Sequence, residues 1–287
     1  MSARVGYTAS DAVPNYPAND VMDGKKVMQI RKDEEAKSVT FFDFKGLMAP
    51  VFTCFNDDER KTINISYINR YAKWLKSQNI DGVLVNGITG EGPSLGLLER
   101  KVNAECWWRA ASENSLMMML QIGGGALPDV LEMGCYAEQL GVHSVCCLPE
   151  IFYKPRTIDQ LIAYCKVVAK TCPSRPFFYH HIPRITNVNS TGMLLGFGAF
   201  ESSFLNIHPV LFCDIYAAML NNEVEQAKNK QIALNAIVNR KFPKADDFPY
   251  ISGQKSWFSE LNGQKLKIYV GPARIHAGKS EAAKKKD

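Results

Sequence analysis

Apolar residues along the chain occur in two kinds of segment that follow one another. The first kind is a short continuous run, which predicts a buried strand and occurs at residues 46–55, 81–87, 116–123, 144–149 and 176–183. The second kind places apolar residues three or four positions apart, which predicts an amphipathic helix, and occurs at 64–78, 95–113, 127–140 and 157–171. Strands without in–out alternation are typical of parallel sheets covered on both faces. The pattern therefore predicts a parallel α/β fold, either a barrel or an open doubly wound sheet.

The strand–helix rhythm ends after Pro183. Residues 184–192 are loop-like, and a short apolar piece follows at 193–200. The remainder predicts helices at the end of 206–220, at 223–238 and over 241–262, the last interrupted at Pro243, Pro249 and Gly253. About six strand–helix units can be counted, whereas eight close a (β/α)₈ barrel.

The charge and hydropathy of the chain argue against several classes of protein. The 34 Lys and Arg against 29 Asp and Glu give a formal net charge of +5, without the clustered basic face that nucleic-acid binding requires. No apolar run reaches the roughly 18 residues of a membrane helix. Residues 1–30 also lack the apolar core of a secretory signal. We therefore expect a soluble, cytoplasmic protein that binds neither nucleic acid nor membrane.

Composition also divides the chain. Residues 1–43 are polar and predict a flexible extension, residues 44–275 predict the folded domain, and residues 276–287 form a lysine-rich tail. None of the eight cysteines forms a C-x-x-C pair, and without a secretory signal this favours reduced thiols over disulfides or zinc. We expect no metal and no cofactor.

A glycine-rich loop, Asn86-Gly87-Ile88-Thr89-Gly90-Glu91-Gly92, follows the second predicted strand. Functional sites of parallel α/β folds gather at the carboxyl ends of the strands, and the N–H groups of such a loop can face an anion. The spacing matches neither the Rossmann fingerprint nor the P-loop, so a plain strand-to-helix turn is the alternative.

A second group, Tyr179-His180-His181, ends the fifth predicted strand. Histidine and tyrosine there are candidates for proton transfer near neutral pH. The two-residue period of a strand directs Tyr179 and His180 to opposite faces. Histidines bonded to backbone carbonyls, with no chemical role, are the alternative.

These segments together resemble one family. The runs GLMAPVFTCF, NGITGEG, EIFYKP, PFFYHHIP and GPARI are similar, in this order, to N-acetylneuraminate lyase. That enzyme stands with dihydrodipicolinate synthase among the class I Schiff-base aldolases on a (β/α)₈ barrel. The resemblance covers about residues 44–183 and resumes over about 193–275. It implies a TIM-type barrel lacking about two strand–helix units, with C-terminal helices.

The resemblance implies retro-aldol cleavage of sialic acid to N-acetylmannosamine and pyruvate. In the family a lysine on the sixth strand forms an imine with the keto group, a tyrosine at the end of strand five shuttles the proton, and the glycine-rich loop holds the carboxylate. It also implies a homo-oligomer, a tetramer. Carried onto this chain, the substrate contacts are Ile88, Thr89, Gly90, Glu91 and Ser203, and the proton-transfer candidates are His180 and Tyr179.

This chain departs from the family pattern at three places. Ile88 stands where the family has a hydroxyl, and His180 stands at the family's tyrosine position, with Tyr179 one place early. No lysine occurs between Lys170 and Lys228, where strands six and seven of the family would lie. Lys154 is a weak candidate for a replacement nucleophile.

Three interpretations remain open at the level of sequence. The first is an active sialate lyase, whose catalysis we expect to be impaired in this chain. The second is a non-catalytic paralogue or shortened isoform that binds a keto acid or an intact lyase subunit. The third is a shortened product that does not fold alone.

Overall fold

The computed structural model describes residues 42–151, 153, 155, 157–180, 199–241, 247–262, 266, 268 and 269. All of them belong to one compact unit, Ser38–Asp287. The predicted extension 1–43 and tail 276–287 lie almost wholly outside the described residues, so the domain boundaries stay a prediction.

The described strands form one parallel sheet. They are β1 (Gly46–Pro50), β2 (Gly82–Val85), β3 (Met117–Gln121), β4 (Ser144–Cys147), β5 (Phe177–Tyr179) and β6 (Ala199–Glu201). Their order is β5-β4-β3-β2-β1-β6, and each neighbouring pair is parallel. The last strand in the sequence thus pairs with the first, as in a closing barrel.

Two positions in the barrel are vacant among the described strands. β5 and β6 each have a strand on one side only, and a (β/α)₈ barrel would place two more strands between them. The parallel α/β sheet confirms the predicted fold class of barrel type. The segment 181–198, where the strand–helix rhythm of the sequence ends, lies outside the described residues, so the position of the break stays a prediction.

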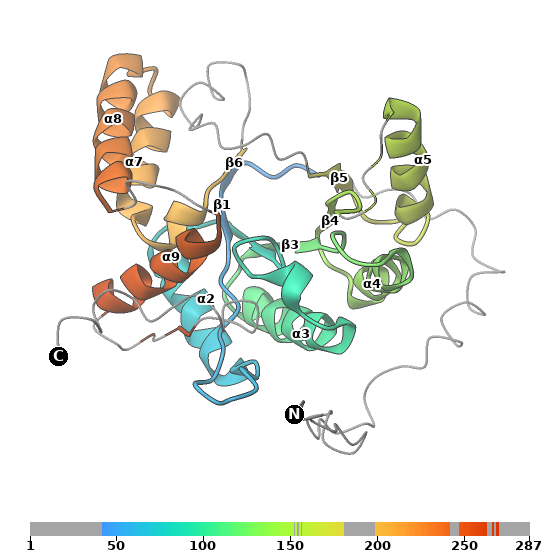
Figure 1. Cartoon of the computed structure of the whole chain (residues 1–287). Helices are drawn as coiled ribbons and strands as arrows, with labels where there is room; N and C mark the ends of the chain where they lie inside the picture. Colours follow the sequence, from blue (N-terminus) through green and yellow to red (C-terminus); the bar gives the residue numbers. More distant parts are fainter. Residues whose placement is uncertain are drawn as a thin grey trace, which may run out of the picture. The chain divides into compact units, whose positions relative to one another are not determined.

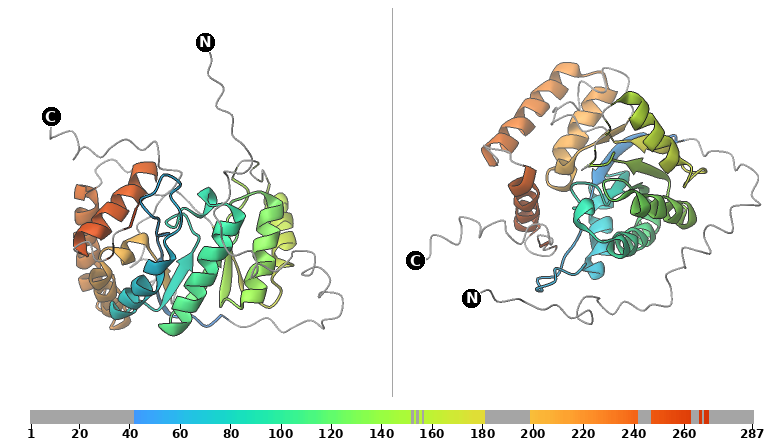
Figure 2. Two further views of the ribbon diagram at one scale, coloured as in Figure 1. Left: turned by 90° about the horizontal axis from the view of Figure 1, so that it is seen from below. Right: turned by 45° about the vertical axis from the view of Figure 1, so that its right-hand side comes forward.

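The helices are α2 (Ile68–Ser77), α3 (Leu97–Glu113), α4 (Leu127–Leu140), α5 (Ile158–Ala169), α7 (Pro209–Leu220), α8 (Val224–Lys241) and α9 (Asp247–Leu261), with short 3₁₀ turns η2 (Ile65–Tyr67), η3 (Gly92–Ser94) and η4 (Ser203–Asn206). Figure 1 shows α2 to α5 on the outer side of the sheet, and in the left view of Figure 2 α3 and α4 lie side by side. α7 and α8 pack together as a hairpin (Figure 1).

One helix prediction is wrong in detail. α9 runs without a break through Pro249 and Gly253, which were expected to interrupt it. Pro249 lies in the first turn, where the missing N–H has no intrahelical acceptor, so the proline does not stop the helix. Pro243 lies outside the described residues.

The sheet has an outer core and an inner one. Alternate strand residues face the helices, and they include the fully buried Val83, Val85, Met118, Leu120 and Val145. The opposite face lines the barrel lumen with Met48, Leu84, Met119 and Cys146. Burial on both faces explains why these strands show no in–out alternation in the sequence.

The segment before β1 crosses the lumen toward the other edge of the sheet (Figure 1). Phe42 and Phe44 pack on the inner core, and the Phe42 ring lies edge-on to Phe178 of β5 at 4.9 Å between ring centres. Aromatic side chains at the start of the domain therefore fill space beside β5, where a complete barrel has its next strand.

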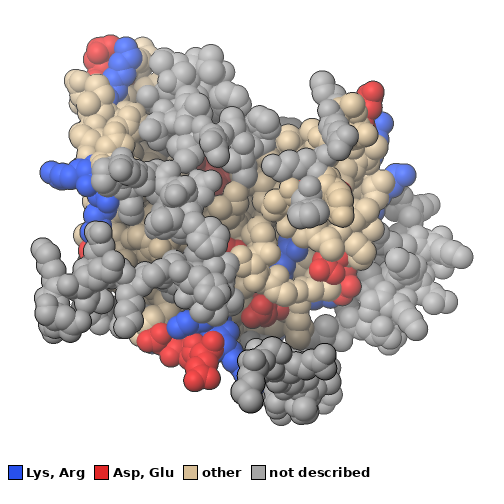
Figure 3. Space-filling model, viewed as in Figure 1, with Lys and Arg blue, Asp and Glu red and all other residues tan. Residues whose placement is uncertain are grey.

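The surface and the helices show further properties. On the face drawn in Figure 3, acidic and basic side chains lie next to one another rather than gathering by sign. No helix in the described part of the chain is long and apolar enough to cross a membrane.

Candidate active site

The glycine-rich loop lies at the carboxyl end of β2 and holds an unusual backbone. Asn86 and Glu91 adopt left-handed conformations, with φ of 59° and 56°. A Cβ atom on Gly92 would lie 1.8 Å from the Asn86 carbonyl oxygen, so only glycine fits there. The loop closes on itself through N–H groups of Glu91 and Gly92, which donate to the carbonyls of Ile88 and Gly87 at 2.9 and 3.0 Å.

Buried polar side chains fix this loop from beneath. The Thr53 hydroxyl donates to the Gly90 carbonyl at 2.5 Å. From α3, the Asn103 amide donates to Asn86 Oδ1 at 2.8 Å, and the Asn86 amide donates in turn to the Arg100 carbonyl at 2.9 Å. Such a buried network of hydrogen bonds holds the loop in one shape.

Arg100 stabilises the backbone that follows the neighbouring strand, β3. Its guanidinium is buried and donates to the Ile122 and Gly123 carbonyls at 2.6 and 3.2 Å. Burial lowers the pKa of Arg100 from its ordinary value. These bonds satisfy carbonyls that lie just beyond β3 and have no ladder partner there.

An ion pair joins the loop to a distant helix. Lys255 of α9 is fully buried and pairs with the Glu91 carboxylate, whose side chain is equally buried. The ammonium also donates to the Thr53 and Tyr269 carbonyls at 2.9 and 3.1 Å. Glu91 therefore anchors the loop. Its partner, Lys255, was not identified as a site residue by the sequence analysis.

The other predicted substrate contacts differ in their exposure to solvent. Ile88 is 42% exposed at the top of the loop, whereas Thr89 is buried. Ser203, in η4 after β6, accepts a hydrogen bond from the Gln254 amide at 3.2 Å. The structure thus brings the loop and Ser203 to the carboxyl ends of β2 and β6, which are separated in the sheet by β1, and Ile88 is the most exposed of these residues.

The candidates at the end of β5 are separated as the two-residue period predicts. Phe178 belongs to the inner cluster and Phe177 packs on the outer core, so His180 follows the inner face and Tyr179 the outer one. Tyr179 is 39% exposed. Of the two proton-transfer candidates, only His180 lies on the side of the lumen. His181 lies outside the described residues.

A glutamine orients the His180 ring. Gln121 Oε1 accepts the N–H groups of Gly123 and Leu148 at 2.9 and 3.0 Å, so its NH₂ group must face the opposite way. That group lies 3.1 Å from His180 Nδ1, which therefore accepts. In the neutral ring the proton is then on Nε2. Desolvation lowers the pKa of His180, so the ring is neutral at pH 7 and Nε2–H is a weak acid facing the lumen.

One carboxylate was missed by the sequence analysis. Glu201 ends β6, and its register with Met48 places it on the lumen side. The Glu201 side chain is exposed, so solvent screens much of the effect by which desolvation raises the pKa of its carboxyl. The signal was available in the sequence, as an acidic residue at the end of a short apolar run.

The strands offer no lysine to this space. None of the residues in β1 to β6 is a lysine. The amine of Lys255 is held in its ion pair beneath the loop. Lys154 lies outside the described residues.

The cysteines behave as packing residues. Cys146 and Cys147 are buried thiols that point to the inner and outer cores respectively, which confirms their predicted opposite faces. Burial, and secondarily the Glu201 carboxylate, raises the pKa of Cys146. Within the described residues no group of three or more His, Cys, Asp or Glu side chains could hold a metal ion.

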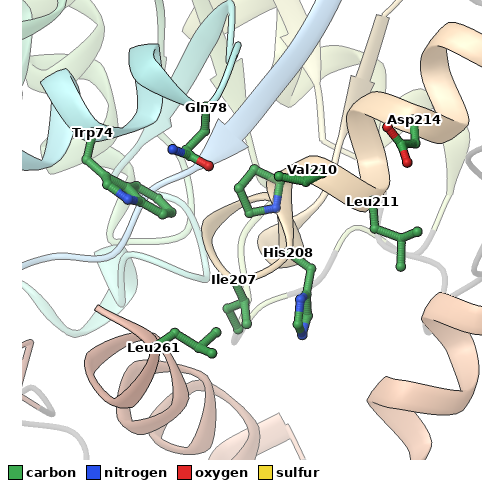
Figure 4. Close-up of a pocket in the computed structure, with 9 residues that line it drawn as sticks. Trp74, Gln78, Ile207, His208, Val210, Leu211, Asp214 and Leu261 are labelled. Carbon is green, nitrogen blue, oxygen red and sulfur yellow. The ribbon is translucent and has the colours of Figure 1, made fainter. Parts of the chain in front are cut away.

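A separate cavity of about 330 Å³ lies outside the barrel (Figure 4). Its walls come from α2, from the start of α7 and from the end of α9, and they include Trp74, His208 and Leu261. None of the sequence-predicted site residues lines it.

Comparison with known proteins agrees with this arrangement. The model of the dihydrodipicolinate synthetase family matches residues 43–192. N-acetylneuraminate lyase A of Xenopus laevis is 36% identical over 145 residues, which are 50% of this chain and 47% of that protein. The N-acetylneuraminate lyase of Rattus norvegicus is 30% identical over 66% of this chain and 59% of its own. The chain spans about half the length of the curated relatives it matches.

Solved structures match more of the fold at lower identity. N-acetylneuraminate lyase from Aliivibrio salmonicida superposes with a TM-score of 0.74 at 20% identity, covering 84% of this chain and 94% of that one. The enzyme from Proteus mirabilis gives 0.70 at 21% identity, covering 80% and 92%. With the family model matching more than half of its residues, the chain belongs to the dihydrodipicolinate synthetase family, in which it is similar to N-acetylneuraminate lyase.

Proposed function

We propose that this chain is an N-acetylneuraminate lyase-like protein that keeps a keto-acid binding loop but has strongly impaired retro-aldol activity on sialic acid. One observation carries the proposal. The described strands present no lysine to the lumen, and the buried Lys255 is already paired with Glu91.

The missing amine affects the central step of the chemistry. In a class I aldolase, the protonated imine takes up the electron pair released when the C3–C4 bond of the substrate breaks. Removal of a covalent nucleophile costs on the order of 10⁶ in rate. His180 retains a proton at Nε2, but it supplies no electron sink.

Binding of a keto acid is supported by the loop. Its backbone is rigidly held by Thr53, Asn103 and Lys255, and it lies at the strand ends where this fold class binds ligands. Ile88 replaces one hydroxyl of the resembled motif, which weakens carboxylate binding without removing the N–H groups of the loop.

Borohydride trapping tests the proposal. The purified chain is incubated with pyruvate and borohydride, beside an intact N-acetylneuraminate lyase as positive control, and both are examined by intact-mass and peptide mass spectrometry. We expect a reduced lysine adduct on the control and none on this chain, together with turnover of sialic acid lower by on the order of 10⁶. A stoichiometric adduct on any lysine of this chain would refute the proposal.

A second candidate function is binding to an intact lyase subunit. The observation that favours it is the pair of sheet edges at β5 and β6, since unpaired parallel edges tend to acquire partners. Co-expression with a tagged intact lyase tests it, and separate elution of the two chains in size-exclusion chromatography would count against it. The same experiment on the chain alone tests the proposed homotetramer.

The proposed compartment is the reducing cytoplasm. Thiols such as those of the adjacent Cys146 and Cys147 are suited to it. Fractionation of cells that express the full chain is the corresponding measurement.

A further inference from the structure

Two consecutive residues of α9 contact the two separate parts of the candidate ligand site. The Gln254 amide donates to Ser203 Oγ at 3.2 Å, and the neighbouring Lys255 ammonium pairs with Glu91 of the glycine-rich loop. Gln254 and Lys255 are both fully buried. Adjacent side chains on a helix diverge by about 100°, which lets one turn of α9 hold Ser203 in one direction and the loop in another.

The backbone of Ser203 is fixed independently of α9. Asn206, at the end of η4, is fully buried, and its amide donates to the Ser203 and Pro50 carbonyls at 2.8 and 2.9 Å. Asn206 Oδ1 accepts the Tyr71 hydroxyl at 2.6 Å. These bonds join η4 to the end of β1 and to α2. We therefore expect loss of the Gln254 amide to leave η4 in place and to change only the side chain of Ser203.

The contact with Gln254 determines what the Ser203 hydroxyl can do. Its oxygen accepts from the amide, so its hydrogen is directed elsewhere and can donate to a ligand. Ser203 is partly exposed, whereas the other three residues of η4 are buried. Gln254 Oε1 is buried and has no hydrogen-bond partner among the described residues. A buried amide with one group left unbonded adds little to stability, which favours a role in orienting Ser203.

We infer that Gln254 is a positioning residue, which orients the Ser203 hydroxyl to donate to an oxygen on the distal chain of a hydroxylated 2-keto acid. This inference rests on the proposed binding of a keto-acid carboxylate by the glycine-rich loop. The loop follows β2 and Ser203 follows β6, with β1 between them, so the two contacts are about 9–10 Å apart at the usual strand spacing. Pyruvate is too short to make both contacts, whereas sialic acid is long enough.

The test compares the Kd values of sialic acid and of pyruvate for the full chain, measured by ligand-observed NMR. Gln254→Met keeps the length of the side chain and removes the amide together with its unbonded oxygen. We expect the Kd of sialic acid to rise about two- to tenfold, the effect of losing one neutral hydrogen bond. The Kd of pyruvate should not change, and Tm should stay within about 4 °C of the parent value.

Matched variants separate orientation of Ser203 from a general loss of packing. Ser203→Ala should raise the Kd of sialic acid as much as Gln254→Met does, and the double variant should show no further rise, because both changes remove the same hydrogen bond to the ligand. Gln231→Met on α8 is the control. The Gln231 amide donates to Asn235 at 3.0 Å, and its buried Oε1 likewise has no partner in the described structure. This variant should leave both Kd values unchanged.

Several results would overturn the inference. They are an unchanged or lower Kd of sialic acid in Gln254→Met, an equal rise for both ligands, and additive effects in the double variant. Absence of sialic acid binding by the parent chain would also overturn it, and the proposed keto-acid binding would still stand if pyruvate binds. Absence of binding by both ligands would contradict the proposed keto-acid binding and this inference together.

Discussion

Removal of the Lys255 ammonium should destabilise the domain far more than removal of a surface lysine. In Lys255→Met the aliphatic stem remains, but Glu91 keeps a buried charge without a counter-charge. Breaking a buried pair in this way costs about 3–5 kcal/mol. For a domain of roughly 250 residues, each kcal/mol lowers Tm by about 2–4 °C, so the expected loss is roughly 6–20 °C.

Differential scanning calorimetry measures this shift, and Lys228→Met on α8 is the matched control. Lys228 pairs with Glu225 at 2.7 Å, but both side chains are largely exposed, so the expected cost is below about 1 kcal/mol. The double variant Glu91→Gln with Lys255→Met should be more stable than the sum of the single changes implies, because both charges are removed together. Equal Tm values for Lys255→Met and Lys228→Met would refute the anchoring role.

Two other changes give distinct expectations. Gly92→Ala forces a Cβ against a loop carbonyl at 1.8 Å and should cost more than about 2 kcal/mol in urea unfolding, whereas Gly87→Ala, whose Cβ has 3.4 Å to its nearest neighbour, should cost less than about 1 kcal/mol. Tyr71→Phe removes the buried 2.6 Å bond to Asn206 and should cost about 1–2 kcal/mol in the same assay, and an unchanged free energy of unfolding would contradict this.

The strand–helix alternation was predictable because each element carries a local signal. The runs at 81–87 and 116–123 contain β2 and β3, and the helix predicted at 127–140 has the bounds of α4. The strands are shorter than the apolar runs, since residues such as Phe52 and Cys54 lie beyond the end of β1 while staying buried. The pattern of apolar residues indicates which residues are buried. Burial extends beyond the residues that are hydrogen-bonded in a strand.

The candidate site was predictable only in part. The glycine-rich loop and the opposite faces of Tyr179 and His180 follow from local spacing. The partners that hold the site, Lys255 for Glu91 and Gln121 for His180, lie 164 and 59 residues away in the sequence. Contacts between residues so far apart in the sequence form only when the strands and helices pack together. No local sequence pattern predicts them.

The reach of α9 back to the loop has a consequence for how the protein is made. Glu91 leaves the ribosome 164 residues before its ammonium partner, which at about 5–20 residues per second is a delay of roughly 8–30 seconds. Throughout that interval the nascent loop contains a carboxylate that cannot be buried favourably. The loop after β2 therefore cannot form its ion pair until translation has passed residue 255. A transcript that stops earlier yields a polypeptide in which Glu91 never acquires its Lys255 partner.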